Sequence, residues 1–586
     1  MKKNILAFLA YLLTALTLGG VGGGFLSSCS DSYMEEVNTD DTKASSIEPS
    51  AQLTTALLQT YGDFGLMDTY RSYITGFTQH FAGGWNVSNY AGSVHANDDQ
   101  MRLIWDQYYG VGIKNLVDAI ANSEDKPNTN AALRIHRVYL MSVLTDTYGD
   151  IPCTEAGKGF TEGISNPKYD TQEEIYNFFF DELAKCVKQL GTGSDRIGGD
   201  VTSLNGSSDA WRKYANALRL RFAMRISNVN PSKAQQEFEK ALNAEGGYVS
   251  SADDDAYIIY TDGPFTLYDG SRDLDFRVNA LGEILYGQDS TSPTFVCSTF
   301  FDILNDNKDP RLYRICRHYL NTKRSEITPD REWNVDVTDE VLSYLKKMGD
   351  TEHPCDPGAA WWDNWINAPA NSAIPTLDRL VKMYPDAGFD GSNYPARMMR
   401  PFLSIDFEMP DRPGALITSA EVEFLLAEAK LNGWNVSGDI ESHFKAGVHA
   451  AMQWLNNHYL QPDDKISDTE ISTYINRIIA SGALNDNAKE AINTQAWIHH
   501  MMNPSEAWAN LRRSDYPVIK DRTKLAKFES DFTYDDTNLQ TPTRLRYPIL
   551  EAQYNSDNYK AAISRIGGSD DWHKRLWWDT ADINVK

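Results

Sequence analysis

The sequence lacks the short motifs on which the commonest catalytic centres are built. Its 586 residues contain no H-E-x-x-H, no G-x-S-x-G and no G-x-x-x-x-G-K-[ST], the signatures of zinc proteases, serine hydrolases and phosphate-binding loops. The 11 histidines are scattered, and the adjacent pair His499 and His500 is expected to diverge on a helix rather than share a metal. A glycoside hydrolase needs only two carboxylates, however, and 81 acidic residues leave that class open.

Positive charge and long apolar runs are also scarce. The formal net charge of −26 argues against nucleic acid or an anionic membrane as a partner, because both require basic patches. After the first residues no stretch approaches the about 20 apolar residues that a membrane-spanning helix needs. With 41% hydrophobic and 23% charged residues the composition is that of a globular chain.

Cysteine is rare, and the chain has no C-x-x-C pair. The absence of closely spaced cysteine pairs disfavours a cysteine zinc site. Apart from Cys29, an odd number remains, so at least one thiol stays free whatever disulfides form. We interpret the remainder mainly as small buried residues, with a disulfide framework as the alternative; they are Cys153, Cys186, Cys297, Cys316 and Cys355.

The N-terminus has the layout of a secretory signal peptide. Lys2 and Lys3 precede an apolar run, Ile5 to Leu18, that is short for a membrane span. The boundary Leu26-Ser27-Ser28-Cys29 resembles the lipobox of bacterial lipoproteins, in which the cysteine is acylated after cleavage. Residues 1–28 are therefore predicted to be a signal peptide, and Cys29 to be lipidated. A cleaved signal with an incidental cysteine is the alternative.

Several stretches predict amphipathic helices that pack in pairs. Apolar residues recur every three to five positions, and Thr171 followed by Glu174 is a capping box. The predicted helices cover residues 101–123, 131–149, 171–190, 208–227, 419–434 and 440–455. The last two are joined through Gly433 to Gly438, and paired helices with small contact residues suggest tetratricopeptide-like stacking, although no strict repeat of about 34 residues is present. We expect a mainly α fold of stacked helix pairs.

Two further regions complete the predicted organisation. Residues 29–50 are polar, which is typical of a flexible tether. Between about 248 and 411 Gly, Pro, Asp and aromatic residues mix without periodicity. This region is predicted to be a large, irregular, loop-rich insertion, and long irregular segments in folded proteins tend to carry function. Residues 51–586 are expected to form a single domain around it.

Eight stretches, in order along the chain, resemble the SusD/RagB family of Bacteroidetes outer-membrane lipoproteins, in particular its SusD-like branch. They are "LTDTYGDIPCTEA" (144–156), "PKYDTQEEIY" (167–176), "WRKYANALRLRFAMRIS" (211–227), "NDNKDPRL" (305–312), "ITSAEVEFLLAEAKLNGW" (417–434), "EAWANLRRSDYP" (506–517), "RLRYPILEAQYNSDNY" (544–559) and "RLWWD" (575–579). The acidic residues after Cys29 also resemble, in part, the export tag of such lipoproteins. One departure is Cys153, where an aromatic residue is more usual.

The resemblance implies a tetratricopeptide-like fold with a loop-rich ligand-binding region. It also implies a cell-surface lipoprotein, anchored in the outer membrane by its lipid, that acts as the lid of a SusC-type TonB-dependent transporter. The implied cargo is an oligosaccharide, or a peptide in some relatives. The protein is expected to have no catalytic activity and no cofactor.

Loop aromatics beside amides and carboxylates are the candidate ligand contacts, because sugar faces stack on indole and phenol rings. Aromatic residues make up 11% of the chain. The alternative is packing, which we favour for the helical Trp105, Trp211, Trp454, Trp497 and Trp508, while Trp577 and Trp578 are expected to pin the C-terminus. The candidates are Trp85, Asn86, Asn89 and Tyr90 in one loop, Trp361, Trp362, Asp363, Asn364 and Trp365 in the insertion, and Trp333.

One acidic cluster is a candidate metal site. Asp253, Asp254 and Asp255 follow one another and could ligate calcium through carboxylate oxygens. We favour a solvated loop for this segment.

Overall fold

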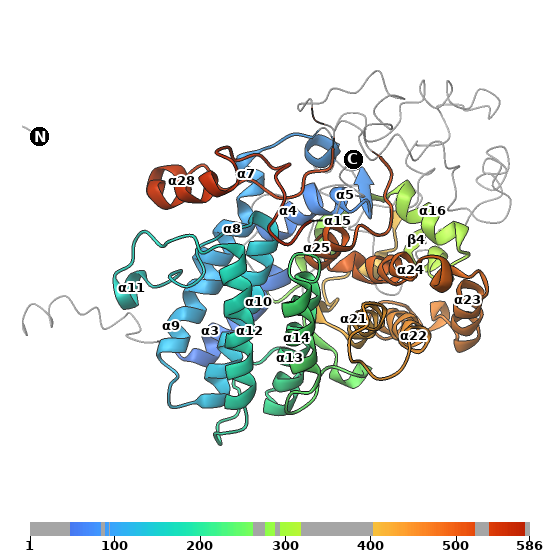
Figure 1. The fold of residues 1–586 in the computed structure, drawn as a ribbon, viewed down its shortest axis with the longest axis horizontal. Coiled ribbons are helices and arrows are strands. Elements are labelled where there is room, and N and C mark those ends of the chain that lie inside the picture. Colours follow the sequence, from blue (N-terminus) through green and yellow to red (C-terminus); the bar gives the residue numbers. More distant parts are fainter. Residues whose placement is uncertain are drawn as a thin grey trace, which may run out of the picture. The chain divides into compact units, whose positions relative to one another are not determined.

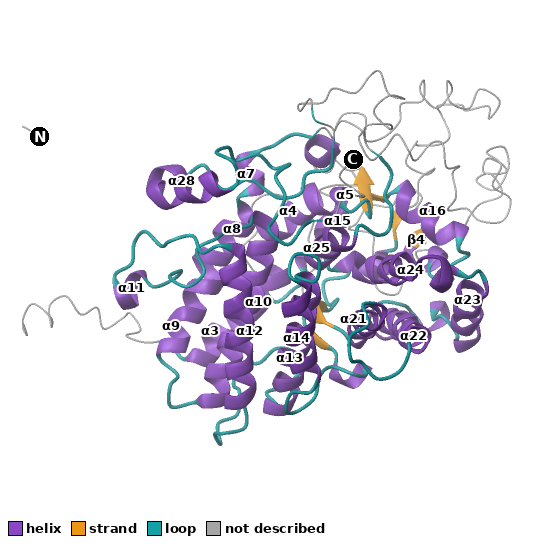
Figure 2. Ribbon diagram, viewed as in Figure 1, coloured by secondary structure: helices purple, strands orange, loops and turns teal. Residues whose placement is uncertain are grey.

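Helices make up most of the part of the chain that the structure describes, as the sequence predicts (Figure 2). The computed structural model describes residues 47–83, 88–92, 94–261, 276–286, 294–317, 402–521, 538 and 540–580. The chain divides into Met1–Ile47 and Glu48–Lys586, and the described helices and strands all belong to the second unit. The predicted signal peptide and Cys29 lie outside the described residues. Helix α3 begins at Pro49, within the last residues of the predicted tether.

The first half of the fold is a row of antiparallel helices that lie side by side (Figure 1). Successive members pack against each other, which is the arrangement expected for tetratricopeptide-like pairs. Local sequence sets their ends: Thr171 and Glu174 form the predicted capping box, and α10 ends at Gly149, whose φ of 98° suits glycine. The row contains α3 (Pro49–Gly62), α9 (Lys114–Ala121), α10 (Pro127–Tyr148), α12 (Gln172–Gln189), α13 (Ser208–Arg225) and α14 (Pro231–Leu242).

The helix predicted over 101–123 is divided into shorter segments. A π-helical stretch, η3 (Tyr108–Ile113), interrupts it, and α9 follows directly. A Cβ added at Gly112 would lie 2.7 Å from the Cδ1 atom of Leu140 on α10, so a larger residue in this turn would require the Leu140 side chain to shift. A second π segment, η1, continues α4 in the same way. Before η3, the predicted helix contains the end of α7 (Asp98–Met101) and α8 (Leu103–Gln107). Earlier in the chain, α4 (Phe64–Thr69), η1 (Tyr70–Ile74) and α5 (Thr75–Phe77) follow one another.

The second half of the fold is a further set of packed helices. The predicted pair is present as α21 and α22, connected through Gly433 and Gly438, whose φ angles are 77° and 78°. Gly447 on α22 allows close contact with the ring of Phe424 on α21, because a Cβ there would lie 2.6 Å from the ring. The helices are α21 (Ser419–Leu431), α22 (Ile440–His458), α23 (Asp468–Ala480), α24 (Ala483–His499) and α25 (Pro504–Ser514).

The region predicted to be irregular, 248–411, contains regular elements where it is described. Its strands are too short to show alternation in the sequence. Strands β1, β3, β5 and β4 form a sheet in that order, and β2 pairs with β6. The elements within this region are β2 (Ala256–Ile258), α15 (Ala280–Tyr286), β3 (Thr294–Val296), α16 (Ser298–Asp306), α17 (Leu312–Ile315), β4 (Cys316–Arg317) and β5 (Phe402–Leu403). Strand β1 (Phe81–Gly83) precedes the region and β6 (Gly414–Ile417) follows it.

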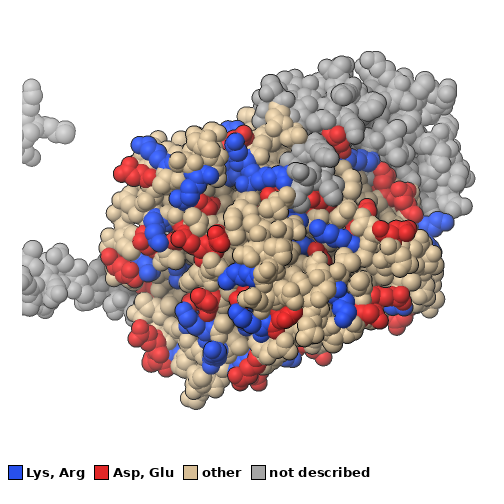
Figure 3. Space-filling view, viewed as in Figure 1, with Lys and Arg blue, Asp and Glu red and all other residues tan. Residues whose placement is uncertain are grey.

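Short helices complete the described chain. They are η2 (Ser88–Gly92), α11 (Gly159–Glu162), η4 (Ala252–Asp254), η9 (Ile405–Phe407), η10 (Pro462–Asp464), η11 (His500–Met502), α27 (Glu551–Tyr554) and α28 (Ser556–Arg565). None of the helices in the described part of the chain is long and apolar enough to cross a bilayer. Lysine and arginine are interspersed with acidic side chains on the face shown in Figure 3.

The core contains the aromatic residues and thiols that the sequence places there. Five helical tryptophans expected to pack are each at most 5% exposed: Trp105, Trp211, Trp454, Trp497 and Trp508. Four cysteines are buried, as predicted: Cys153, Cys186, Cys297 and Cys316. Cys355 lies outside the described residues. Trp578 is fully buried, whereas Trp577 is only partly buried.

Charged side chains also lie deep in the core. Arg221 on α13 contacts Glu421 of α21 through Nε–Oε1 and Nη2–Oε2, at 2.5 and 2.7 Å. One turn further along, Arg225 donates to both oxygens of Glu506 at 2.6 Å and lies 3.4 Å from Asp146. Burial raises the pKa of Glu421, but the Arg221 guanidinium more than offsets this and holds the pKa below its ordinary value. These pairs tie α10, α13, α21 and α25 together.

Candidate ligand-binding site

The four-stranded sheet gathers the ends of the predicted ligand-binding loops. Gly83 at the end of β1 is paired with Thr294 at the start of β3. The segment that carries Trp85 and Asn86 therefore begins beside the residue at which 287–293 ends. Backbone pairing fixes this junction, because a register slip would turn every side chain of a strand to the opposite face.

The same sheet also holds both ends of the longest loop. Arg317, the last residue of β4, is paired with Phe402, the first residue of β5. Phe402 is also paired with Phe295 of β3. Residues 318–401 thus leave and re-enter the fold at neighbouring strands. Because three strand residues span about 10 Å, the start of 84–87, the end of 287–293 and both ends of 318–401 lie within one small region.

Tyr90 is the candidate whose side chain the structure describes. It belongs to η2, which also contains Asn89. Its ring lies 5.6 Å from the ring of Tyr73 and is stacked on His95 at 5.7 Å. Tyr90 is partly buried, and burial raises the pKa of its phenol. Part of this ring is therefore used for packing against Tyr73 and His95.

The other candidates are not placed by the structure. Asn89 lies in η2, but its side chain is outside the described part of the chain. So are the remaining predicted contacts: Trp85, Asn86, Trp333, Trp361, Trp362, Asp363, Asn364 and Trp365. These residues stay predictions, and the structure supplies the framework from which their segments emerge.

A buried aromatic stack lies next to strand β1 of the sheet. His80, next to β1, stacks on Trp497 of α24 with ring centroids 4.2 Å apart. Its Nε2 donates to the Trp497 carbonyl oxygen at 3.0 Å, and its own carbonyl accepts from the N–H of Cys297 at 2.9 Å. Burial lowers the pKa of His80 to about 3, so the ring is neutral at physiological pH. The strand from which 84–87 starts is thus next to a packed, uncharged aromatic stack.

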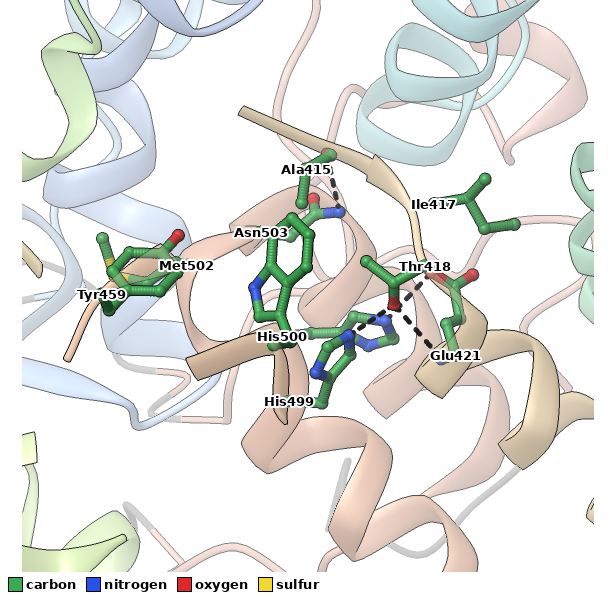
Figure 4. Close-up of a pocket in the computed structure, with 10 residues that line it drawn as sticks. Ala415, Ile417, Thr418, Glu421, Tyr459, His499, His500, Met502 and Asn503 are labelled. Atoms are coloured by element: carbon green, nitrogen blue, oxygen red, sulfur yellow. Dashed lines mark hydrogen bonds and ion pairs between the residues drawn. The ribbon is translucent and has the colours of Figure 1, made fainter. Parts of the chain in front are cut away.

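The adjacent histidines do not diverge as the sequence predicts. The rings of His499 and His500 lie 5.3 Å apart and line one small enclosed cavity (Figure 4). The helix becomes 3₁₀ at His500, which turns the second ring toward the first. Their Nε2 atoms contact Thr418 Oγ1 at 2.7 Å and Glu421 Oε2 at 3.2 Å respectively. The cavity has room for about one water molecule, too little for a saccharide.

Two carboxylates of the acidic cluster pair with other groups of the protein and are not arranged around a cation. Asp254 pairs with Lys213 at 2.6 Å, and Asp255 accepts the backbone N–H of Ser419 at 2.6 Å. Asp255 is only 5% exposed, so the solvated loop predicted for this segment is wrong at that position. Among the residues that the structure describes, no group of three or more His, Cys, Asp or Glu side chains is placed to hold a metal.

The chain matches two family models and many solved structures. Residues 41–329 match a family described as "Starch-binding associating with outer membrane", and residues 390–579 match "Susd and RagB outer membrane lipoprotein". A structure titled "Bacteroidetes AC2a SusD-like" is 38% identical, with a TM-score of 0.76, and the match covers 91% of this chain and 100% of that one. The chain therefore belongs to the SusD-like family of outer-membrane lipoproteins.

Two further structures agree with this assignment. One titled "chitin-binding protein" is 29% identical, with a TM-score of 0.68 over 91% of this chain and 100% of that chain. A SusD homolog from Bacteroides uniformis ATCC 8492 is 22% identical, with a TM-score of 0.67 over 92% of this chain and 100% of that chain, and it supports the fold alone. No curated protein matches the chain. The mainly α, tetratricopeptide-like fold predicted from the sequence is confirmed.

Proposed function

We propose that this protein captures oligosaccharides at the cell surface and serves as the lid of a SusC-type TonB-dependent transporter. The observation that carries the proposal is the four-stranded sheet, at which 84–87 starts, 287–293 ends and 318–401 both starts and ends. Two of these three segments contain the predicted tryptophans, so the sheet gives them a common base. A family described as starch-binding supports a glycan as cargo.

Binding rests on flat aromatic faces combined with hydrogen-bonding groups. Indole rings such as Trp85 and Trp361 stack on the C–H face of a sugar. Amide and carboxylate groups such as Asn86, Asp363 and Asn364 exchange hydrogen bonds with its hydroxyls. A site of this kind is weak by itself, and the affinity increases when a transporter closes the other side of the cavity.

Lipidation and cargo remain part of the proposal. Cys29 is proposed to carry acyl chains, each buried methylene of which contributes about 0.8 kcal/mol to membrane attachment. A relative titled "chitin-binding protein" makes β-linked N-acetylglucosamine oligomers the first cargo to test. Peptide cargo for the same lid is the second candidate, and it would require backbone-pairing groups in place of an aromatic platform. Hydrolysis of the glycan is the third.

Affinity gel electrophoresis across a polysaccharide panel tests the binding role. The protein should be retarded by at least one glycan, and a variant with Trp361, Trp362 and Trp365 replaced by Ala should lose that retardation. The control is Phe160→Ala, which removes a ring that is 91% exposed on α11 and should change nothing. Thermal melting of each variant shows whether the fold is kept.

Each other result has a defined meaning. Failure of every glycan to retard the wild-type protein would contradict the saccharide proposal and favour peptides. Reducing sugar released from the gel polysaccharide would contradict a purely binding role. Equal retardation of the wild-type protein and the triple variant would remove 361–365 from the site. Co-purification with a TonB-dependent barrel tests the lid role separately, and its absence would contradict that role.

A further inference from the structure

A groove lies where the C-terminal segment meets the start of α12. It encloses about 1050 Å³ of space, part of it open solvent. Its walls come from the end of α10, the start of α12, the end of α28 and residues 574–577. Among the described residues that line it, none belongs to the four-stranded sheet. A concavity of this size with a few convergent polar groups is the usual form of a small-molecule site.

The arginines that line the groove are already engaged by other groups of the protein. Arg565 donates to Asp150. Arg544 is 1% exposed and pairs with Asp570, and Arg575 also has an interaction within the protein. A ligand with a net charge therefore meets no excess of the opposite charge in this groove. Burying an unpaired charge is costly, so these pairs favour a ligand that is uncharged.

Two charged side chains in the groove make no ion pair and no hydrogen bond within the described part of the chain. Glu173, in the first turn of α12, is exposed, and Lys574, from the C-terminal segment, is half-buried. The carboxylate can only accept hydrogen bonds, and the ammonium group can only donate them. A hydroxyl group does both. A ligand with several hydroxyls can therefore bind both side chains without a charge of its own.

The indole of Trp577 gives the groove an apolar wall. The residue is partly exposed, and the ring of Tyr176 lies 6.3 Å away, tilted by 42° rather than stacked. The Trp577 backbone N–H donates to Gln172 Oε1 at 2.9 Å, and Gln172 Nε2 donates to the Thr145 carbonyl oxygen at 2.9 Å. The backbone that carries the indole is thereby fixed to α12. A preorganised aromatic face of this kind suits the C–H face of a sugar ring.

We propose that this groove is a second saccharide site, which takes an uncharged pyranose ring. The ring packs its C–H face on Trp577, while its hydroxyls donate to Glu173 and accept from Lys574. β-Linked glucose and N-acetylglucosamine suit the indole best, because their ring substituents are equatorial and both ring faces carry C–H groups. The site uses none of the loops at the sheet and is separate from the proposed glycan-capture site.

Fluorine NMR of the full chain in detergent, labelled with 5-fluorotryptophan, reports on this groove alone. The resonance that is absent in Trp577→Phe belongs to Trp577. Cellohexaose or N-acetylchitohexaose should shift that resonance in the wild type, and equally in the variant with Trp361, Trp362 and Trp365 replaced by Ala. Failure of the glycan-capture proposal leaves this result unchanged, because the triple variant lacks the tryptophans on which that proposal depends.

Titration of the same resonance locates the polar contacts. Glu173→Ala and Lys574→Ala should each raise the dissociation constant at least about tenfold, the loss expected for a hydrogen bond to a charged group. The controls Asp181→Ala and Lys188→Ala remove the same charges at exposed positions on α12, about 12 and 22 Å along the helix from Glu173. Both controls should bind as the wild type does. Thermal melting shows whether each variant keeps its fold.

The proposal is wrong if neither hexasaccharide shifts the Trp577 resonance. It is also wrong if the shift disappears in the triple variant, because the ligand then occupies the loops at the sheet. Trialanine is the third probe, and a shift with trialanine alone would assign the groove to a zwitterionic peptide and overturn the saccharide. Unchanged dissociation constants in both Glu173→Ala and Lys574→Ala would overturn the proposed polar contacts.

Discussion

Arg221 and Glu421 are 200 residues apart in the chain and form a two-point ion pair in the core, with N–O distances of 2.5 and 2.7 Å. Both side chains are 4% exposed. In the same core, Arg513 pairs with Glu428 at 2.7 Å through both of its terminal nitrogens. Helices that a sequence pattern presents as amphipathic are thus joined by buried charges as well as by apolar faces.

Removal of one partner of this pair should be strongly destabilising. Arg221→Met leaves the Glu421 carboxylate buried opposite an apolar chain, and we expect the free energy of unfolding to fall by about 3–5 kcal/mol. The double variant Arg221→Met, Glu421→Met removes both charges and should recover much of the loss. Urea unfolding of the two variants measures this. Equal losses in the single and double variants would contradict the assignment of the cost to an unpaired charge.

The contact between α21 and α22 should tolerate no extra atom at Gly447. Alanine normally favours a helix over glycine by up to about 1 kcal/mol. Here its Cβ would lie 2.6 Å from the ring of Phe424, which is 2% exposed and cannot swing away. Overpacking costs about 1–3 kcal/mol, so Gly447→Ala should be net destabilising. Thermal melting checks this, with exposed Ala446→Ser as the control, and a raised melting temperature for Gly447→Ala would refute it.

Asp255 should make the folded state less stable as the pH rises. Burial raises the pKa of this carboxyl to about 7, against an ordinary value of 3.8. Between these values the folded chain holds a proton that the unfolded chain has lost, so the contribution of Asp255 to stability declines from about pH 4 to pH 7 and is lowest above pH 7. Asp255→Asn keeps an acceptor for the Ser419 N–H without ionising.

Denaturation at several pH values tests this directly. The stability of Asp255→Asn relative to the wild type should grow from pH 4 to pH 7 and then level off. Thr469→Ser, a change at an exposed position on α23, provides the baseline. A difference that is the same at every pH would show that the carboxyl does not titrate in this range.

Histidines with a lowered pKa have the opposite effect on the pH dependence of stability. Burial lowers the pKa of four of them, to about 3 or 4, so that the unfolded chain gains protons below pH 6.5 that the folded chain does not; they are His80, His136, His458 and His499. Stability should therefore fall as the pH drops from about 6.5 toward 4. Because four histidines oppose one aspartate, we expect the net effect of acid to be destabilising.

Histidine resonances measured by NMR separate this prediction from general acid effects. None of these four rings, of which His80 and His136 are fully buried, should titrate down to pH 5. His443 is the internal control, because its hydrogen bond to Glu423, Nδ1–Oε2 2.7 Å, raises its pKa above the ordinary value. Titration of His80 near pH 6.5 would contradict the buried, neutral state.

The helices that sequence analysis predicted share one property: their limits are set by local chemistry. The Thr171–Glu174 capping box and the glycine at 149 act within a few residues of the helix ends. The buried tryptophans were predictable for the same reason, since their positions follow helical periodicity. The sheet was not predictable, because strands of two or three residues have no alternation to detect.

The buried ion pairs could not be predicted from local patterns. Arginine is ordinarily exposed, so nothing within α13 indicates that Arg221 and Arg225 are buried, and their partners lie far away in the chain. The rings of His499 and His500 converge because the helix tightens at its last turn, a change that a regular helical wheel does not include. Trp577 was expected to pin the C-terminus, and its half-exposed ring is visible only once α12 is placed beside it.

The pairing of Arg317 with Phe402 has a consequence for how such proteins diversify. A segment whose two ends are cross-strand neighbours needs no particular length to bridge them. The pairing of β4 with β5 therefore sets no requirement on the number of residues between Arg317 and Phe402. In evolution and in the laboratory, this junction is a place where the length of the chain can change without a change in strand register.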